Sequence, residues 1–549
     1  MQKFIEKATA LCFTGMMAVI LFVLFFLSKM QYYCKPVYSG SNPAMAAASF
    51  GITGAAAGVI LLLKRKGKWK GFPYEKAVRW GTLALFLFQC YLAYNIRFET
   101  KWDVGYAILP SARAIAAGKK EEILNWYFSQ YQNNMFLTAV YSLILRGNAK
   151  IGIFNGQDEL MSIVLINAIV NSVVCRLTFQ TAKRFVREGF AFFAYLLTVL
   201  LVGISPWFTI CYSDSFGLLF PMLSLFLYTG KGLQMDRDEK KRDSRGSFLR
   251  QGIRFCVLCI LGYLGYLIKP QTLILLIAIG IVEGCRLFRK TDLKKWICIP
   301  AFCVGACLCV GGIHYGLGKM YDSMGFQIEG AKRFGITHYL MMGLNPQTDG
   351  VYSEEDVQTS TDCKNLAERT ETNLRICGER MKEFGPAGFL EHWKKKILIN
   401  YNDGTFAWSM EGGFYDEIYE PRNSIVSGTL REFYYNSGKY YKNFYTMEQS
   451  IWLLILGLTF FTGCLFFRRE YAEKDTNPAV LQLALIGLTL FELLFEARAR
   501  YLYTYAPVYA LLAAVGAEQI LWMIKRCGTF KRRINSGMQE RLQNGDGHE

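Results

Sequence analysis

Long apolar segments follow one another along this chain, and they constrain its fold more than any other feature. About twelve of them approach the roughly 20 residues that a helix needs to cross the hydrocarbon layer of a bilayer. They lie at residues 11–28, 44–63, 78–96, 159–179, 189–210, 214–229, 252–268, 271–285, 296–315, 450–467, 478–495 and 502–524. The pattern predicts an all-α polytopic membrane bundle with about twelve transmembrane helices.

The composition adds one water-facing part to this bundle. Of the 549 residues, 52% are hydrophobic and 19% are charged, which is too apolar for a soluble multidomain protein. The long hydrophilic stretch 317–449 has 15 Lys or Arg and 19 Asp or Glu residues, and we expect an extracellular α-rich or mixed domain there. The other predicted parts are two additional N-terminal transmembrane helices at 1–78, a membrane core at 79–316 and 450–524, and a cytoplasmic tail at 525–549.

Lys and Arg residues set the expected orientation. They cluster in alternate loops, at 64–76, 183–187, 230–254, 286–295, 468–469 and 525–533. Because loops rich in Lys and Arg stay in the cytoplasm, this alternation predicts a multi-pass protein of the plasma membrane with both termini in the cytoplasm. No A-x-A-like cleavage site follows the first apolar segment, so we expect that segment to be retained as a span.

Two outward-facing regions carry further structural predictions. In the first outer loop, 97–158, we expect a surface helix at 104–117 that is interrupted at Pro110, and an interfacial or re-entrant helix at 134–145, which is too short to span. In the second, residues 401–448 are rich in Tyr, Phe, Gly and Asn and suggest a loop over the membrane face. The polar C-terminal residues 534–549 are expected to be disordered.

The cysteines give no disulfide framework. Most of the 16 cysteines lie inside apolar segments, where they behave as small hydrophobic residues. Cys363 and Cys377 are the candidates for a disulfide in the outer region, and the sequence leaves their pairing open.

Ionisable residues stand at four outward turns. Asp103 follows the third span, Asp214 lies between spans five and six, and Lys269 lies between spans seven and eight. The outer end of span eleven carries Glu492, Glu496, Arg498, Arg500 and Tyr501. Ionisable groups at membrane depth cost about 2.5–3.5 kcal/mol each on insertion scales, so they usually line a cavity or pair with each other.

Each of these residues also has a simpler interpretation. Asp103 and Asp214 are common types of helix cap, and Lys269 before Pro270 is placed to snorkel to the membrane surface. Glu492, Glu496 and Arg500 are spaced four residues apart, so we expect them on one helical face, with Glu496 and Arg500 forming a structural ion pair.

Several classes of function are disfavoured. None of the four His residues has metal-ligand spacing with another His, Cys or carboxylate. The sequence contains no Walker A motif, no Rossmann glycine pattern and no G-x-S-x-G elbow, which argues against ATP-driven transport and serine hydrolysis. We expect no nucleic-acid partner.

Short motifs in the outward regions give a family resemblance. They are Trp102-Asp103-Val104-Gly105-Tyr106, Tyr131-Gln132-Asn133-Asn134, Tyr212-Ser213-Asp214, Lys269-Pro270 and the segment 495–502 with its Arg498, Arg500 and Tyr501. In their order and topology they resemble the GT-C superfamily of integral membrane glycosyltransferases. The similar branch is glycosyltransferase family 39, the protein-mannosyltransferase-like enzymes, and the segments 338–345 and 402–406 resemble a Gram-positive bacterial subgroup. Val104 replaces a frequent second acid, and Gln132 replaces a usual proline.

The resemblance implies a reaction at the extracytoplasmic face of a bacterial plasma membrane. A sugar would pass from a polyprenyl-phosphate-linked donor to a hydroxyl of a cell-envelope glycan, glycolipid or protein. Asp103 would act as general base, and Asp214 would orient the acceptor or bind a divalent cation, Mg²⁺ or Mn²⁺. Lys269, Arg498, Arg500 and Tyr501 would bind the donor phosphate, with Tyr106 and Glu496 in supporting roles.

Two other functions remain open on the sequence. A lipid-linked glycan transporter or flippase also has many spans and buried charges, although here the charges gather at the outer ends of the spans. A polysaccharide polymerase or ligase shares the lipid-linked donor and the large outer region.

Overall fold

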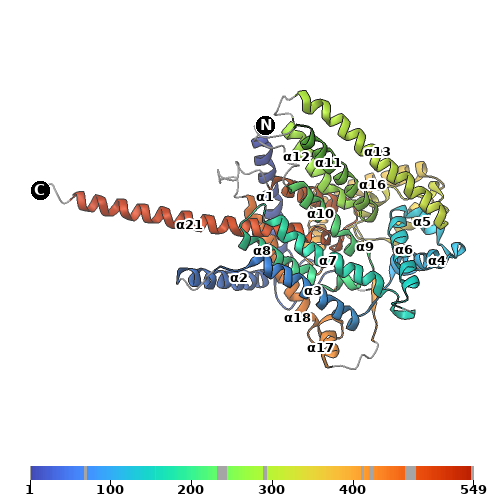
Figure 1. The fold of residues 1–549 in the computed structure, drawn as a ribbon, viewed down its shortest axis with the longest axis horizontal. Coiled ribbons are helices and arrows are strands. Elements are labelled where there is room, and N and C mark those ends of the chain that lie inside the picture. Colours follow the sequence, from blue (N-terminus) through green and yellow to red (C-terminus); the bar gives the residue numbers. More distant parts are fainter. Residues whose placement is uncertain are drawn as a thin grey trace.

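The computed structural model is predominantly helical (Figure 1) and describes residues 2–66, 71–154, 156–230, 244–287, 293–409, 413–419, 425–463 and 478–545. Each of the twelve predicted spans overlaps a helix. These helices are α1 Gln2–Phe26, α2 Asn42–Arg65, α3 Tyr74–Asn95, α7 Met161–Ala182, α8 Glu188–Thr198, α10 Leu219–Thr229, α11 Ser244–Ile268, α12 Leu273–Leu287, α13 Leu293–Met324, α18 Tyr441–Phe460, α19 Ala479–Leu494 and α21 Ala506–Gly545.

Seven helices of the described residues are long and apolar enough to cross a membrane: Glu6–Phe26, Asn42–Arg65, Met161–Ala182, Arg250–Ile268, Pro300–Met324, Tyr441–Gly463 and Ala506–Arg526. Three other predicted spans form shorter apolar helices, at Glu188–Gly203, Pro270–Cys285 and Ala479–Leu494. Much of the basic loops at 230–254 and 468–469 lies outside the described residues, so the orientation stays a prediction.

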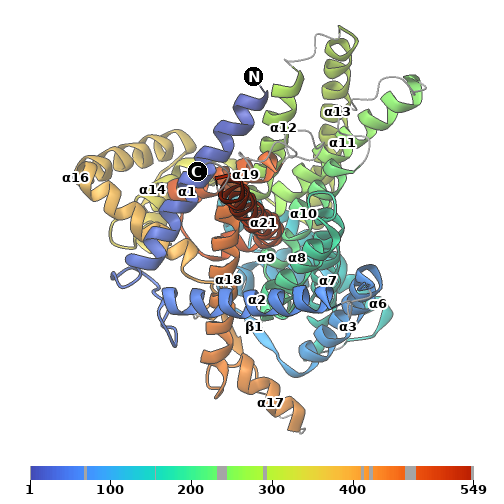
Figure 2. The same cartoon turned by 90° about the vertical axis from the view of Figure 1, so that its left-hand side faces the viewer.

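Helix α21 forms the centre of the packed core. Its first half packs against α18, α8 and α7, and its end leaves the bundle (Figures 1 and 2). At the α18 contact, a Cβ on Gly516 would lie 1.9 Å from the carbonyl oxygen of Leu458, so only glycine fits there. Since α21 continues to Gly545, the expected disorder from residue 534 onward is wrong up to that residue.

Helices form in the loop 97–158 where they are predicted, and their place at the outer membrane surface stays a prediction. A π-helical turn, Val104–Ile108, leads into α4 Leu109–Ala117, and Pro110 lies in the first turn of α4 rather than breaking a helix. After a 3₁₀ turn at Lys120–Glu122 come α5 Asn125–Gln130, a second 3₁₀ turn at Gln132–Asn134 and α6 Met135–Ile151, which is longer than the predicted 134–145. Helices α4, α5 and α6 gather at the end of the molecule opposite the free end of α21 (Figure 1).

The region between α13 and α18 is helical at its start. It contains α14 Ile336–Gly343, α15 Glu354–Asp362, a long α16 Leu366–Tyr401 kinked at Gly385, and α17 Ile425–Tyr434. A short antiparallel pair joins β1 Phe98–Thr100 to β2 Tyr415–Glu417. Cys363 and Cys377 are free thiols. The domain boundaries stay predictions, although α13 runs past 316 and α18 begins before 450.

The prediction of a surface loop at 401–448 is wrong. Residues 401–408 are buried in the core, and α17 and the start of α18 occupy much of the rest. Their polar groups are satisfied internally, because Asp403 accepts hydrogen bonds from the backbone N–H groups of Thr405 and Ala407 at 2.9 and 2.8 Å. Trp207 of the core donates its indole N–H to the carbonyl oxygens of Thr405 and Phe406. Composition alone does not distinguish such a buried polar turn from a surface loop.

Gly516→Ala should destabilise the protein, because the new methyl group collides with the α18 backbone. Overpacking of this kind typically costs about 1–3 kcal/mol, which thermal unfolding of the purified protein in lipid would measure as a lower Tm. The matched control is Gly58→Ala on α2, where nothing lies within 4 Å of the added atom. Equal Tm values for the two variants would contradict the packing assigned to α18 and α21.

Candidate functional site

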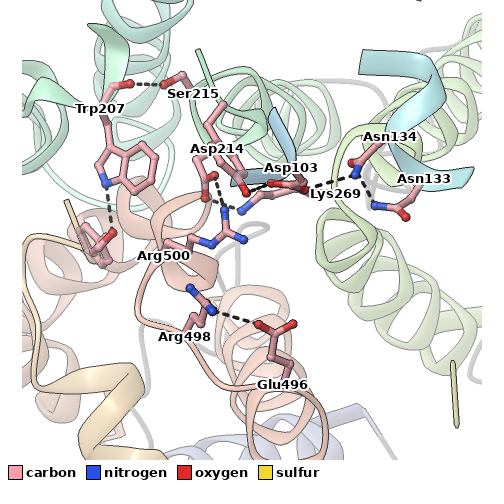
Figure 3. A network of polar contacts seen from close by, with 12 residues as sticks. Asp103, Asn133, Asn134, Trp207, Asp214, Ser215, Lys269, Glu496, Arg498 and Arg500 are labelled. Carbon is pink, nitrogen blue, oxygen red and sulfur yellow. Dashed lines mark hydrogen bonds and ion pairs between the residues drawn. The ribbon is translucent and has the colours of Figure 1, made fainter. Parts of the chain in front are cut away.

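A cavity of about 680 Å³ brings together the four turns that carry the predicted site residues. Seven of the eight predicted site residues line it: Asp103, Tyr106, Lys269, Glu496, Arg498, Arg500 and Tyr501. The eighth, Asp214, lies directly behind the wall and bonds to Lys269. Figure 3 shows Lys269 and Arg500 directed toward Asp214, and Arg498 directed toward Glu496.

The local backbone explains how Asp103 reaches the cavity. The backbone N–H of Lys101 bonds to Phe414 at 2.7 Å and so extends the β1–β2 pairing to the residue before Trp102. Trp102 then takes a left-handed conformation with φ +49°, which is uncommon for a residue with a side chain. A Cβ on Gly105 would lie 2.0 Å from the Thr100 carbonyl oxygen, so glycine is required there. The sharp turn sends the Asp103 side chain into the cavity.

Three donors fix the Asp103 carboxylate. The Tyr212 hydroxyl donates to one carboxylate oxygen. The Tyr127 hydroxyl and the Asn134 amide donate to the other, at 3.2 and 3.4 Å. Asp103 makes no side-chain capping bond to the helical turn that follows it. The simpler interpretation of this residue as a helix cap is therefore wrong.

A buried ionic cluster forms the facing wall. Asp214 is fully buried and accepts a hydrogen bond from the Lys269 ammonium, and the Arg500 guanidinium lies 3.7 Å from its other oxygen. Asp214 makes no capping bond in its helix α9, Ser213–Gly217. Lys269 is only 5% exposed and lies over the Tyr501 ring, so it does not snorkel to the surface.

The predicted helical face of Glu492, Glu496 and Arg500 is wrong. Helix α19 ends at Leu494, the next residues are non-helical, and the short helix α20 begins at Arg500. Glu496 pairs with Arg498 at 2.9 Å, while Arg500 turns to Asp214. The cause is a long-range contact: the backbone N–H of Ala497 bonds to the Gly350 carbonyl at 2.8 Å and pulls the chain out of the helix.

Three cationic side chains, Lys269, Arg498 and Arg500, gather in this wall, where Asp214 and Glu496 pair with them. The guanidinium of Arg498 also lies 4.7 Å from the Trp102 ring, and that of Arg500 lies 4.5 Å from the Tyr212 ring. The cationic wall therefore contacts Trp102, which precedes Asp103, and Tyr212, which donates to the Asp103 carboxylate.

Tyr106 stands beside Asp103 at the mouth of the cavity and is 49% exposed. Partial burial and then the negative charge of Asp103 raise the pKa of its hydroxyl to about 12. At neutral pH this hydroxyl therefore keeps its proton and remains available as a hydrogen-bond donor.

Sequence reasoning missed several residues of the site. Tyr212 and Asn134 lie in two of the sequence motifs, but no role was predicted for them. The signal that could have identified them is their position beside Asp214 and Asn133. Tyr127 has no such signal, because nothing in its surroundings distinguishes it from a core tyrosine. Arg333 and Tyr339 also line the cavity from the region before and within α14.

The carboxylates of the site do not fit a divalent cation. Asp214 is occupied by a lysine and an arginine, and Asp103 by three hydrogen-bond donors. Across the described residues, no group of three or more His, Cys, Asp or Glu side chains is placed to hold a metal ion. The role of Asp214 as a metal ligand is therefore not supported by its surroundings.

Comparison with known proteins gives one match. The comparisons with curated proteins and with solved structures found none. One family model, described as a conserved hypothetical integral membrane protein, matches residues 2–521. This agrees with the seven helices that are long and apolar enough to span. The chain therefore belongs to this family of integral membrane proteins.

Proposed function

We propose that this protein is an integral membrane glycosyltransferase of the GT-C type, with about twelve transmembrane helices. It transfers a sugar from a polyprenyl-phosphate donor to an acceptor hydroxyl at the extracytoplasmic face. The observation that carries the proposal is a cavity that is lined both by a fixed carboxylate, Asp103, and by three cationic side chains, Lys269, Arg498 and Arg500. Transfer from a lipid phosphate needs these two features together.

The arrangement assigns a part of the reaction to each wall. The acceptor hydroxyl attacks the anomeric carbon, and Asp103 takes its proton as the new C–O bond forms. The bond between the anomeric carbon and the phosphate oxygen breaks, and its electron pair leaves with the polyprenyl phosphate. Lys269, Arg498 and Arg500 stabilise this growing negative charge, and the two arginines suit bidentate phosphate contacts. Tyr106 and Tyr501 donate hydrogen bonds to the substrates.

The position of the cavity suits a donor with a lipid tail. Tyr266 and Ile268 come from the end of the apolar helix α11, and Phe491 and Phe495 come from the end of α19. Ile268 directly precedes Lys269 in the chain, so an apolar and a cationic residue line the cavity side by side there. A head group in the cavity could therefore keep its polyprenyl chain against the membrane helices.

Asp103→Asn should lower the rate of transfer by about 10²- to 10⁴-fold, the range of a positioned general base. Purified protein in lipid would be given a panel of radiolabelled polyprenyl-phosphate sugars with envelope glycan, glycolipid and peptide acceptors. Release of free polyprenyl phosphate measures turnover. Asn keeps the size of Asp, and a wild-type Tm would exclude misfolding as the cause.

The same assay separates the alternatives. A transporter or flippase would move the labelled donor across the bilayer without releasing polyprenyl phosphate, and Asp103→Asn would change its rate little. A polymerase would transfer whole glycan units, which the size of the product reveals. Turnover by Asp103→Asn at the wild-type rate would rule out the role given to Asp103.

Arg500→Gln should lower kcat by about 10²- to 10³-fold, as for other groups that stabilise developing negative charge. The variant should fold, because Lys269 still neutralises Asp214. Arg375→Gln is the matched control, since Arg375 lies on the exposed part of α16 and pairs with Glu379. Equal loss in both variants would contradict a specific role for Arg500.

Transfer should be unaffected by EDTA, because Lys269 and Arg500 already occupy Asp214 and supply the positive charge themselves. The measurement is the rate of polyprenyl phosphate release before and after dialysis against the chelator. Loss of activity that Mg²⁺ or Mn²⁺ restores would show that Asp214 exchanges its basic partners for a metal ion.

A further inference from the structure

A second buried lysine lies outside the proposed chemistry. Lys396 of α16 is fully buried and does not line the cavity. Its ammonium donates one hydrogen bond to the carbonyl oxygen of Gly343, at 2.9 Å, and another to that of Phe495, at 2.5 Å. Gly343 ends α14 and Phe495 follows the last residue of α19, so Lys396 binds the C-terminal ends of two helices at once.

These two helix ends belong to two segments that both line the cavity. Phe334, Ile336, Tyr339 and Tyr352 form what we call the outer wall, which is built on α14 and the chain on either side of it. The inner wall is formed by Phe495, Glu496, Arg498, Arg500 and Tyr501. The Lys396 ammonium is therefore a direct bridge between the two walls.

The backbone at Gly343 and Gly350 lies in close contact with the backbone at Leu494 and Phe495 and with itself. A Cβ on Gly343 would lie 2.5 Å from the carbonyl oxygens of Leu494 and Phe495, and one on Gly350 would lie 2.7 Å from the Gly343 carbonyl oxygen. The bond from Ala497 N–H to the Gly350 carbonyl joins the same two segments. His392, one turn before Lys396, adds a further contact to the Gly343 carbonyl at 2.9 Å.

Among the charged groups, Glu492 acts on Lys396 most strongly, followed by Glu496. Both carboxylate oxygens of Glu492 are buried and lack a hydrogen-bond partner in the described structure. The positive charges that act on this carboxylate are those of Lys396 and Lys269. Burial lowers the pKa of Lys396 to about 7, and the negative charges of Glu492 and Glu496 oppose that shift. Lys396 and Glu492 therefore form one buried pair whose charges depend on each other.

We propose that Lys396 is a positioning residue that fixes the separation of the outer and inner walls through its bonds to Gly343 and Phe495. The inner wall carries Glu496 and Arg498, so the bridge sets where the cationic groups stand relative to Asp103. The effect on turnover rests on the proposed function, whereas the effect on the two wall segments does not.

The test uses a variant that removes both buried charges, Lys396→Met with Glu492→Gln. The single change Lys396→Met leaves Glu492 without a counter-charge and risks misfolding, whereas the double variant avoids that cost. Glu492→Gln alone is one comparison variant, because it separates the loss of the carboxylate from the loss of the lysine bonds. Lys394→Met is the other, because Lys394 lies on the same helix and pairs with Glu391 away from the bridge.

Hydrogen–deuterium exchange of the full-length protein in lipid is the first readout. In the double variant, exchange should quicken in peptides covering 340–352 and 494–503 and stay unchanged in α7. Lys394→Met should match the wild type in all three places, and Glu492→Gln should exchange more slowly than the double variant at the two walls. Unchanged exchange at the two walls would overturn the proposal, and so would an equal increase in α7, which indicates a general loss of stability.

Donor kinetics are the second readout. The double variant should lose about 10- to 100-fold in kcat/KM, the size expected for a misplaced binding group, and mainly through a higher donor KM. A residue with only a structural role would leave the KM of the folded fraction unchanged, and this result also contradicts the proposal. If the wild type releases no polyprenyl phosphate from any donor, the proposed function fails while the exchange experiment still decides the role of Lys396.

Discussion

The site depends on the buried ionic contact between Asp214, Lys269 and Arg500. At this depth Asp214 needs a positive partner, because a buried charge left unpaired typically costs about 3–5 kcal/mol. The contact fastens α9, the turn after α11 and the start of α20 to one another. It also reaches Asp103, since Tyr212 stands two residues before Asp214, packs under the Arg500 guanidinium and donates to the Asp103 carboxylate. The same ionic contact therefore positions both the cationic side chains and the Asp103 carboxylate.

Much of the site was predictable from topology rather than from any motif. The alternation of basic loops places the turns of Asp103, Asp214, Lys269 and Glu496 at the same end of the bundle, and helices packed side by side leave few places for such groups except a common cavity. The helices themselves were predictable because a long apolar segment in a membrane can satisfy its backbone hydrogen bonds within itself only as a helix. The residues that hold the Asp103 carboxylate in place were not all predictable. Tyr127 reaches Asp103 because two segments of the fold lie close together, and no local sequence pattern indicates that contact.

The wrong predictions share a physical cause. The expected pairing of Glu496 with Arg500 assumed that α19 continues, and the i to i+4 rule holds only inside a helix. The hydrogen bond from Ala497 to Gly350 follows the end of the helix. Glu496 then pairs with Arg498, and Arg500 pairs with Asp214. The stretch 401–448 looked like a surface loop because it is rich in Tyr, Phe, Gly and Asn, yet Asp403 accepts the hydrogen bonds of the turn at 403–407 and so allows this part to be buried. In both places a contact between residues far apart in the sequence outweighed a local rule.

Glu492 acts on both buried lysines, one in the contact between the two walls and one in the proposed phosphate-binding group. Its charge acts on Lys396, which bridges the walls, and on Lys269, which faces the cavity. Groups that share a charge partner do not respond independently, so changes at Lys269, Lys396 and Glu492 will not be additive. An anionic substrate beside Lys269 would enter this balance as a further negative charge. The electrostatic state of the cavity is then coupled to the separation of its walls without any contact between the substrate and Lys396.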